Sequence, residues 1–204
     1  MRKLHALWSR DVQFVEIFIR QAHPGPGAPA YRSFEQKFDD AERYAAENDI
    51  PWTILVDDLP GTVHETYGGL ADPSYLIGVD GRVSYYEMWT HAPTLHTKLE
   101  ALRRQGWRGV VDDGVDHIPH MLPALTDGWN ALRHGLPQSF IDLELASPGA
   151  ASLTWIGHQL RPVLAPFTLR ATPLPTSTRL ALAGGAALII GGLLLWSTRG
   201  RRMR

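Results

Sequence analysis

The chain has 204 residues, of which 44% are hydrophobic and 20% charged, a composition typical of a globular protein with one ordinary domain and smaller appendages. The formal net charge of −1 provides no basic field for nucleic acid, and the sequence has no base-reading motif, so nucleic-acid binding is not expected. Cysteine is absent, which excludes disulfides, thiolate metal sites and a cysteine nucleophile within these residues.

Two short apolar runs, Val12–Ile19 and Trp52–Val56, are the predicted strands of the amino-terminal region. The first run is apolar on both faces apart from Gln13 and Glu16, as expected of a strand covered on two sides in a largely parallel sheet. A helix predicted to begin at Ser33 lies between the two runs. The order strand, helix, strand predicts a βαβ unit with a right-handed crossover.

The helix between these strands is predicted to begin with a capping box made by Ser33 and Gln36. Apolar and charged residues then alternate with helical spacing, which indicates an amphipathic helix. One face is lined by Phe34, Phe38, Ala41 and Ala45, and the other by Glu35, Asp39, Glu42 and Arg43.

The next segment predicts a short helix and a β-hairpin. Thr62 and Glu65 form a second capping box. Ser74–Val79 and Val83–Met88 are the predicted hairpin strands, and Asp80–Gly81 supplies the tight turn between them.

A last helix of this region is expected to be capped by Thr94 and to end at Gly106, with an inward face made of leucines. The predicted order is therefore β, α, β, short α, β-hairpin, α, which is most of a thioredoxin-like fold. The predicted fold class is α/β, thioredoxin-like and incomplete at the amino terminus. A complete βαβ unit takes roughly 30 residues, whereas 11 precede Val12. The leucines predicted to face inward on the last helix are Leu95, Leu99 and Leu102.

The stretch 72–83 resembles the thioredoxin-superfamily turn in which a cis-proline precedes the hairpin. Within that superfamily, Ile19–Pro24, with Val56–Asp58 and Tyr67–Gly68 downstream, resembles the iodothyronine deiodinase family and its bacterial relatives. The resemblance covers about half of the chain, roughly residues 4–106. It departs from the family at Gln21, where members tend to place an acid, and in the missing amino-terminal portion.

This resemblance implies a thioredoxin-like oxidoreductase that carries out reductive dehalogenation or thiol redox chemistry. Its nucleophile, a cysteine or selenocysteine, would lie at the junction of a strand and helix that the sequence does not contain. The resemblance implies an external thiol reductant in place of a bound cofactor. A small molecule or a protein thiol would be the substrate.

His23 is the candidate catalytic residue, because it follows a strand at the edge where α/β sheets place their sites and an imidazole can shuttle a proton. The alternative is a loop histidine with no chemical role. Asp72 and Pro73 are the candidate substrate-binding residues that the resemblance implies. Asp57 and Asp58 are adjacent carboxylates, and we expect a loop at the end of the strand there, because neighbouring strand residues point to opposite faces.

His117 and His120 are the best metal-like pair among nine histidines. Pro119 lies between them, and no third ligand stands at a helical offset. No metal site is therefore predicted.

The carboxyl-terminal half predicts a membrane anchor. Residues 107–176 form a Pro-rich, partly helical extension, in which one helix starts at Ser147–Pro148 and ends before Pro162. Leu180–Trp196 is free of charge for 17 positions and lies within a predicted transmembrane helix over 177–198. A basic tail of four arginines follows at 199–204.

The lipid bilayer is the predicted partner, and a row of small residues in the span would permit a homodimer. The positive-inside rule places the arginine tail in the cytoplasm and the main domain outside. The first residues have no apolar run suited to a secretory signal, which slightly favours a cytoplasmic domain. The row of small residues in the predicted span consists of Ala183, Ala187 and Gly191.

Two functions follow from the sequence. The first is a membrane-anchored thioredoxin-like oxidoreductase resembling the iodothyronine deiodinases, whose nucleophile is not among these residues. The second is a non-catalytic, membrane-tethered binding or scaffolding module.

Overall fold

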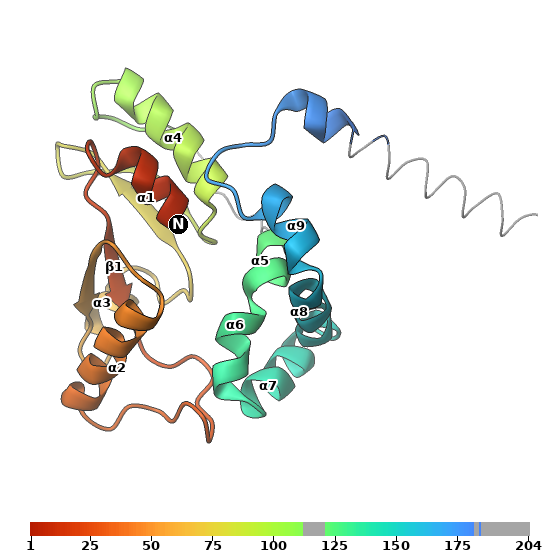
Figure 1. Cartoon of the computed structure of the whole chain (residues 1–204). Coiled ribbons are helices and arrows are strands. Elements are labelled where there is room, and N and C mark those ends of the chain that lie inside the picture. Colours follow the sequence, from red (N-terminus) through yellow and green to blue (C-terminus); the bar gives the residue numbers. More distant parts are fainter. Residues whose placement is uncertain (112–120, 182–183, 185–204) are drawn as a thin grey trace, which may run out of the picture. The chain divides into compact units, whose positions relative to one another are not determined.

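The computed structural model describes residues 1–111, 121–181 and 184 (Figure 1). The chain divides into two units, Met1–Thr172 and Pro173–Arg204. The first unit is of mixed α/β class, mostly helical with two small sheets.

The amino-terminal half of the first unit has the predicted order of elements, preceded by a short helix. The prediction β, α, β, short α, β-hairpin, α is confirmed over residues 15–104. The elements are α1 (Arg2–Trp8), β1 (Val15–Phe18), α2 (Phe34–Glu47), β2 (Thr53–Val56), α3 (Thr62–Thr66), β3 (Ser74–Ile77), β4 (Val83–Glu87) and α4 (Ala92–Arg104).

The strands form two separate pairs within the described ranges. β1 and β2 are parallel, with Val15 opposite Thr53. β3 and β4 form an antiparallel hairpin with an irregularity after Leu76. The turn between them has Gly81 at a φ of 76°, a conformation that glycine adopts without strain.

The prediction of a long first strand covered on both sides is wrong. β1 starts at Val15, which is 51% exposed, and β2 is its one paired neighbour among the described residues. The apolar residues before it belong elsewhere, because Val12 and Phe14 pack against the core cluster of α1, β4 and α4. An apolar run in a sequence identifies residues that pack in the interior, but it does not show how many of them belong to the strand.

The core of this half lies between α1, β4 and α4. Leu4 and Trp8 of α1 pack with Tyr85 of β4 and with the leucines of α4. Trp8 also donates its indole Nε1–H to Nδ1 of His96, at 2.9 Å. The predicted inward face of α4 is confirmed, since Leu95, Leu99 and Leu102 are all buried.

The predicted cap of α2 is confirmed, but its buried face is shifted. The Ser33 hydroxyl accepts a hydrogen bond from the Gln36 amide at 3.2 Å. Phe34 and Phe38 are each 43% exposed, whereas Ala41 of the predicted apolar face is buried. Lys37 of the same helix is buried instead.

The predicted cap of α4 is corrected by three residues, from Thr94 to His91. The helix begins at Ala92 with His91 as its N-cap residue. Thr94 therefore lies in the first turn, where its hydroxyl is 2.9 Å from Nδ1 of His91. The His91 amide donates to Glu87 Oε1 at 2.8 Å, so a buried glutamate helps to fix this corner.

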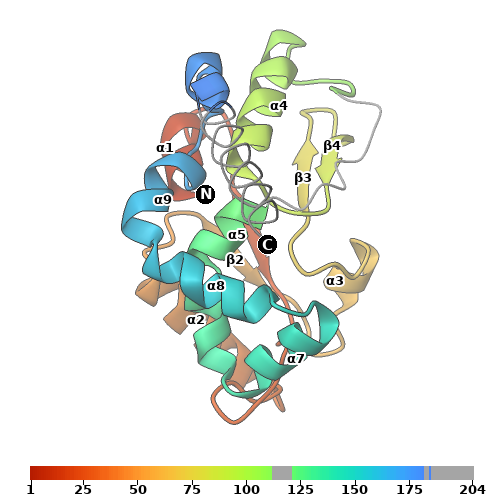
Figure 2. The same ribbon diagram turned by 90° about the vertical axis from the view of Figure 1, so that its right-hand side faces the viewer.

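The carboxyl-terminal half of the first unit is a set of short helices. Prolines lie at several of their boundaries, as predicted, although Pro166 lies inside α9. In Figure 2, α7, α8 and α9 form the near side of the ribbon. The predicted helix between Pro148 and Pro162 is confirmed as α8, preceded by Gly149 at a φ of 89°. The elements are α5 (Met121–Asp127), α6 (Trp129–Leu132), η1 (Arg133–Gly135), α7 (Gln138–Ala146), α8 (Ala150–Gln159) and α9 (Arg161–Thr168).

In the second unit, helical backbone begins at Thr176 and is described through Ala181. Most of the predicted span 177–198, the arginine tail 199–204 and the small-residue row of Ala183, Ala187 and Gly191 lie outside the described residues. Within residues 1–111, 121–181 and 184, no helix has the length and apolar character needed to cross a bilayer.

Candidate functional site

The carboxyl ends of β1 and β2 meet at one edge, where two aspartates follow β2. Asp57 is buried, and its carboxylate accepts hydrogen bonds from the amides of Asp58, Val63 and His64 at 2.9, 3.0 and 2.9 Å. Asp58 accepts from the Gly61 and Thr62 amides at 2.8 and 2.7 Å. The two carboxylates therefore hold the first turn of α3 and are not a catalytic pair.

This arrangement corrects the predicted capping box of α3. Thr62 is the first helical residue and not the cap, because Gly61 is the N-cap residue at a φ of 84°. The Thr62 hydroxyl donates to Asp58 at 2.6 Å, which lowers the pKa of that carboxyl. Glu65 pairs with Arg20 at 3.3 Å instead of closing a capping box.

Lys37 is the buried residue of α2 that the sequence pattern does not reveal. Its side chain is 1% exposed, and Nζ donates to the Asp58 carbonyl at 3.1 Å. Burial lowers the pKa of this lysine, and the charges of Asp57 and Asp58 oppose that shift. Lys37 thus links α2 to the loop that starts α3.

His23 lies in the exposed loop after β1 and contacts the helical half of the unit. Its Nδ1 is 3.3 Å from Oδ2 of Asp142 in α7. Gln138 donates to the other carboxylate oxygen of Asp142 at 2.5 Å. A carboxylate at this distance orients the imidazole, and an oriented imidazole is suited to proton transfer. The sequence could not show the pairing, since the two residues are 119 positions apart.

The loop that carries His23 packs closely on the chain between α6 and α7. A Cβ at Gly27 would lie 2.5 Å from the His134 carbonyl oxygen, and one at Gly25 would lie 2.9 Å from Gln138 Cβ. The two glycines therefore permit a backbone approach that any larger residue would block.

Asp72 and Pro73 lie directly before β3. No hydrogen bond or ion pair of the described part of the chain joins Asp72 to His23. The Asp72–Pro73 peptide bond is trans, whereas the resemblance implies a cis bond. The Asp72 carbonyl accepts hydrogen bonds from the Thr90 amide and hydroxyl at 2.8 and 3.0 Å, which ties the residue to the segment that follows β4.

The Asp72 carboxyl is reached by solvent but has protein on most of its sides. Desolvation by this surrounding protein is the main cause that raises its pKa from 3.8 to about 6, and the Glu16 charge adds to the effect. Glu16 itself accepts a hydrogen bond from the Trp52 indole at 2.9 Å.

Replacing Asp72 by asparagine is expected to stabilise the folded chain near neutral pH. Because the folded-state pKa exceeds the unfolded value of 3.8, the folded chain loses stability as the pH rises from about 4 to 6. A shift of this size corresponds to about 3 kcal/mol, and solvent screening at this exposed carboxyl reduces the expected gain to about 1 kcal/mol.

The measurement is urea unfolding of both chains at about pH 7.5 and about pH 3.5. The difference between them should vanish at the lower pH. Asp39→Asn on the exposed side of α2 is the matched control and should show no such pH dependence. Equal stability of the Asp72→Asn and natural chains at both pH values would contradict the prediction.

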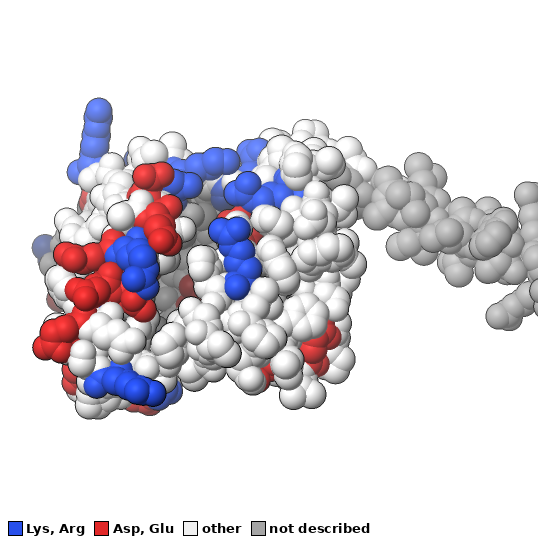
Figure 3. Space-filling view, turned by 60° about the horizontal axis from the view of Figure 1, so that its bottom comes forward, with Lys and Arg blue, Asp and Glu red and all other residues white. Residues whose placement is uncertain are grey.

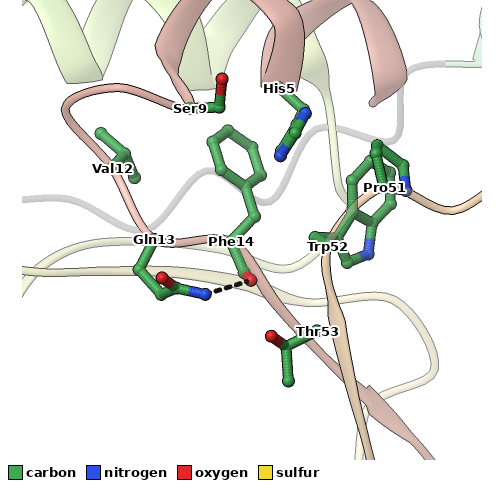
Figure 4. A pocket seen from close by; sticks show the side chains of 8 residues that line it. All are labelled: His5, Ser9, Val12, Gln13, Phe14, Pro51, Trp52 and Thr53. Carbon is green, nitrogen blue, oxygen red and sulfur yellow. Dashed lines mark hydrogen bonds between the residues drawn. The ribbon is translucent and has the colours of Figure 1, made fainter.

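The opposite edge of the parallel pair carries an aromatic hollow that the sequence did not predict (Figure 4). Its cavity volume is about 350 Å³. The centroid of the His5 ring lies 5.1 Å from that of the Phe14 ring, in edge-to-face contact, and 5.6 Å from that of the Trp52 ring. The lining residues are His5, Ser9, Val12, Gln13, Phe14, Pro51, Trp52 and Thr53.

The hollow combines aromatic walls with uncharged polar groups. Its lining contains no carboxylate, lysine or arginine. The exposed faces of such rings favour contact with a planar aromatic group or a guanidinium. The signal in the sequence is weak, because α1 and the starts of β1 and β2 contribute separate pieces.

Comparisons with known proteins found no match to the chain among family models, curated proteins or solved structures. Over residues 1–111, 121–181 and 184, no three histidine, aspartate or glutamate side chains form a group that could hold a metal ion. His117 and His120 lie outside the described residues.

Proposed function

We propose that this chain is a membrane-anchored binding module on a thioredoxin-like scaffold, and not a self-sufficient oxidoreductase. The order of elements from β1 to α4 supports such a scaffold, with a parallel βαβ unit followed by an antiparallel hairpin and a helix. Residues 177–198 supply the anchor. The absence of cysteine supports binding over thiol chemistry, because no residue of the chain can form a thiolate.

The aromatic hollow carries this proposal. It is a concave site lined by aromatic rings in edge-to-face and tilted contact and by uncharged polar groups, and its lining has no activated nucleophile. Such a site binds by shape and stacking and has no means to form a covalent bond. Its ligand is an aromatic or guanidinium side chain of a partner protein.

The test uses the full chain in phospholipid nanodiscs with fluorine-labelled tryptophan. Seven tryptophans give resolvable signals, and Trp52→Phe identifies the one in the hollow. Titration with p-cresol or methylguanidinium should shift the Trp52 signal in a saturable way. Phe14→Ala should abolish the shift, whereas Phe38→Ala, which removes an exposed ring of α2, should leave it unchanged. No saturable shift of the Trp52 signal with either compound would overturn the proposal.

The His23 and Asp142 pair favours a second function, a deiodinase-like oxidoreductase. In this scheme a thiol or selenol of another molecule, for which dithiothreitol can stand in, attacks the halogen of an aryl halide, and His23 delivers the proton that replaces the halogen. An external thiol then displaces the halide and forms a mixed disulfide with the nucleophile, and a second external thiol resolves it, so that the two external thiols end as a disulfide. The histidine is held by Asp142 at 3.3 Å, as a proton donor requires.

The two functions are separated by an activity measurement. Iodide release from an iodophenol by the full chain in nanodiscs, with dithiothreitol as reductant, is expected to stay at the level of the protein-free blank. Turnover by the natural chain that is lost in His23→Ala would establish the oxidoreductase and overturn the binding-only proposal.

A further inference from the structure

The outer faces of α8 and α9 form a continuous apolar surface, which we call the α8–α9 face. Leu153 and Ile156 of α8 and Leu160, the residue between α8 and α9, recur at helical spacing and are 52, 45 and 50% exposed. On α9, Val163 and Phe167 are 67 and 44% exposed. The opposite side of α8 is buried against the rest of the unit through small residues, so the apolar side is the outward one.

Charge is almost absent from this surface. Residues 145–169 contain one fully charged side chain, Arg161. Its Nε donates to Asp127 Oδ1 at 2.9 Å, so its charge is paired. In Figure 3 acidic side chains gather on the side of the unit that carries α2, whereas the side built from α5–α9 is largely uncharged.

A second apolar feature adjoins the face. Trp129, Phe140, Ser152, Trp155 and Ile156 line an open hollow of about 450 Å³. Ile156 belongs to both the hollow and the face, so the uncharged surface extends from α9 across α8 toward α6 and α7. Contiguous exposed apolar surface of this kind marks an interaction site.

The sequence that follows the face indicates its occupant. The uncharged stretch 180–196 begins 11 positions after Leu169, and four arginines follow it. Eleven residues span at most about 40 Å when fully extended. Once 177–198 enters a bilayer, the α8–α9 face is confined to the neighbourhood of that bilayer at a high effective concentration.

We propose that the α8–α9 face lies in the lipid headgroup and acyl boundary, so that the bilayer is its partner and the unit Met1–Thr172 is held on the membrane surface. The inference rests on the anchor of the proposed function and adds a second contact with lipid. An apolar helix face binds an interface in this way by burying its side chains among the acyl chains. The aromatic hollow, which is lined by α1, the β1 approach and the β2 approach, remains available for a partner.

The absence of cysteine makes the test specific, because one introduced cysteine gives one label. Leu153→Cys and Val163→Cys place an environment-sensitive nitrobenzoxadiazole label on the face. Asp39→Cys places it on the exposed side of α2 as a control. The full chain is reconstituted in phosphatidylcholine vesicles that contain a minor share of phosphatidylglycerol, with or without brominated acyl chains.

Brominated lipid should quench both face labels at least about twofold more than the Asp39→Cys label. Leu153→Glu, combined with the label at Val163→Cys, should remove that excess quenching, because a carboxylate is costly in the acyl region. Gln159→Glu is the matched control at a position that borders the face and should preserve the quenching.

Three other results would overturn the inference. If aqueous iodide quenches the face labels as strongly as the Asp39→Cys label, the α8–α9 face is exposed to water. Labels shielded from iodide yet insensitive to brominated lipid show a face covered by protein, either a second copy or residues 180–196. If the chain does not float with vesicles after a high-salt wash, residues 177–198 do not anchor it. This outcome distinguishes failure of the proposed function from failure of the face contact alone.

Discussion

Gly157→Ala is expected to destabilise the folded unit by about 3 kcal/mol, the cost of forcing an atom into a filled space. A Cβ at Gly157 would lie 2.2 Å from the carbonyl oxygen and 2.8 Å from the carbonyl carbon of Leu125. Both contacts are with backbone, so neither neighbour can rotate away, and α5 and α8 would have to separate. In an open helix the same change stabilises by about 1 kcal/mol, so the sign of the effect tests the packing.

The measurement is urea unfolding of the full chain in detergent micelles, followed by far-ultraviolet circular dichroism. Gln159→Ala, an exposed change on the same helix, is the control and should alter the unfolding free energy by no more than about 0.5 kcal/mol. A Gly157→Ala chain as stable as the natural one, or more stable, would mean that α5 and α8 do not approach at this glycine.

Several features predicted from local signals in the sequence are confirmed, although the caps of α3 and α4 are not. The cap of α2 at Ser33, the turn at Gly81 and the leucine face of α4 each depend on residues within a few positions of one another. The hydrogen bonds and the periodicity of these three features depend only on residues within short segments. These features appear in the structure where they were predicted.

Features that depend on distant partners were missed. Lys37 can be buried because its ammonium donates a hydrogen bond to the carbonyl oxygen of Asp58, 21 positions away. No helical periodicity predicts that partner. The same limit applies to the site. His23 meets Asp142 only through the fold, and the aromatic hollow joins residues of three segments. The length of β1 was overestimated because Val12 and Phe14 are apolar for packing against α1 and α4.

Asp57→Ala is the second change expected to have a large effect, a loss of about 3 kcal/mol of folding free energy. The substitution leaves the Asp58, Val63 and His64 amides without their acceptor. It also removes one of two carboxylates whose charge favours the ammonium of buried Lys37. Urea unfolding of the full chain in micelles measures the loss.

A double-mutant cycle with Lys37→Met separates the two causes. If the charge matters, Lys37→Met should cost at least about 1 kcal/mol less in the Asp57→Ala chain than in the natural one, because it then removes an uncompensated ammonium. The destabilisation by Asp57→Ala should also shrink as the pH rises toward 10.5, the unperturbed pKa of Lys37, since burial lowers the folded-state pKa and deprotonation relieves the cost. Additive effects would assign the whole loss to the first turn of α3, and the Asp58 carbonyl alone would then suffice for the lysine.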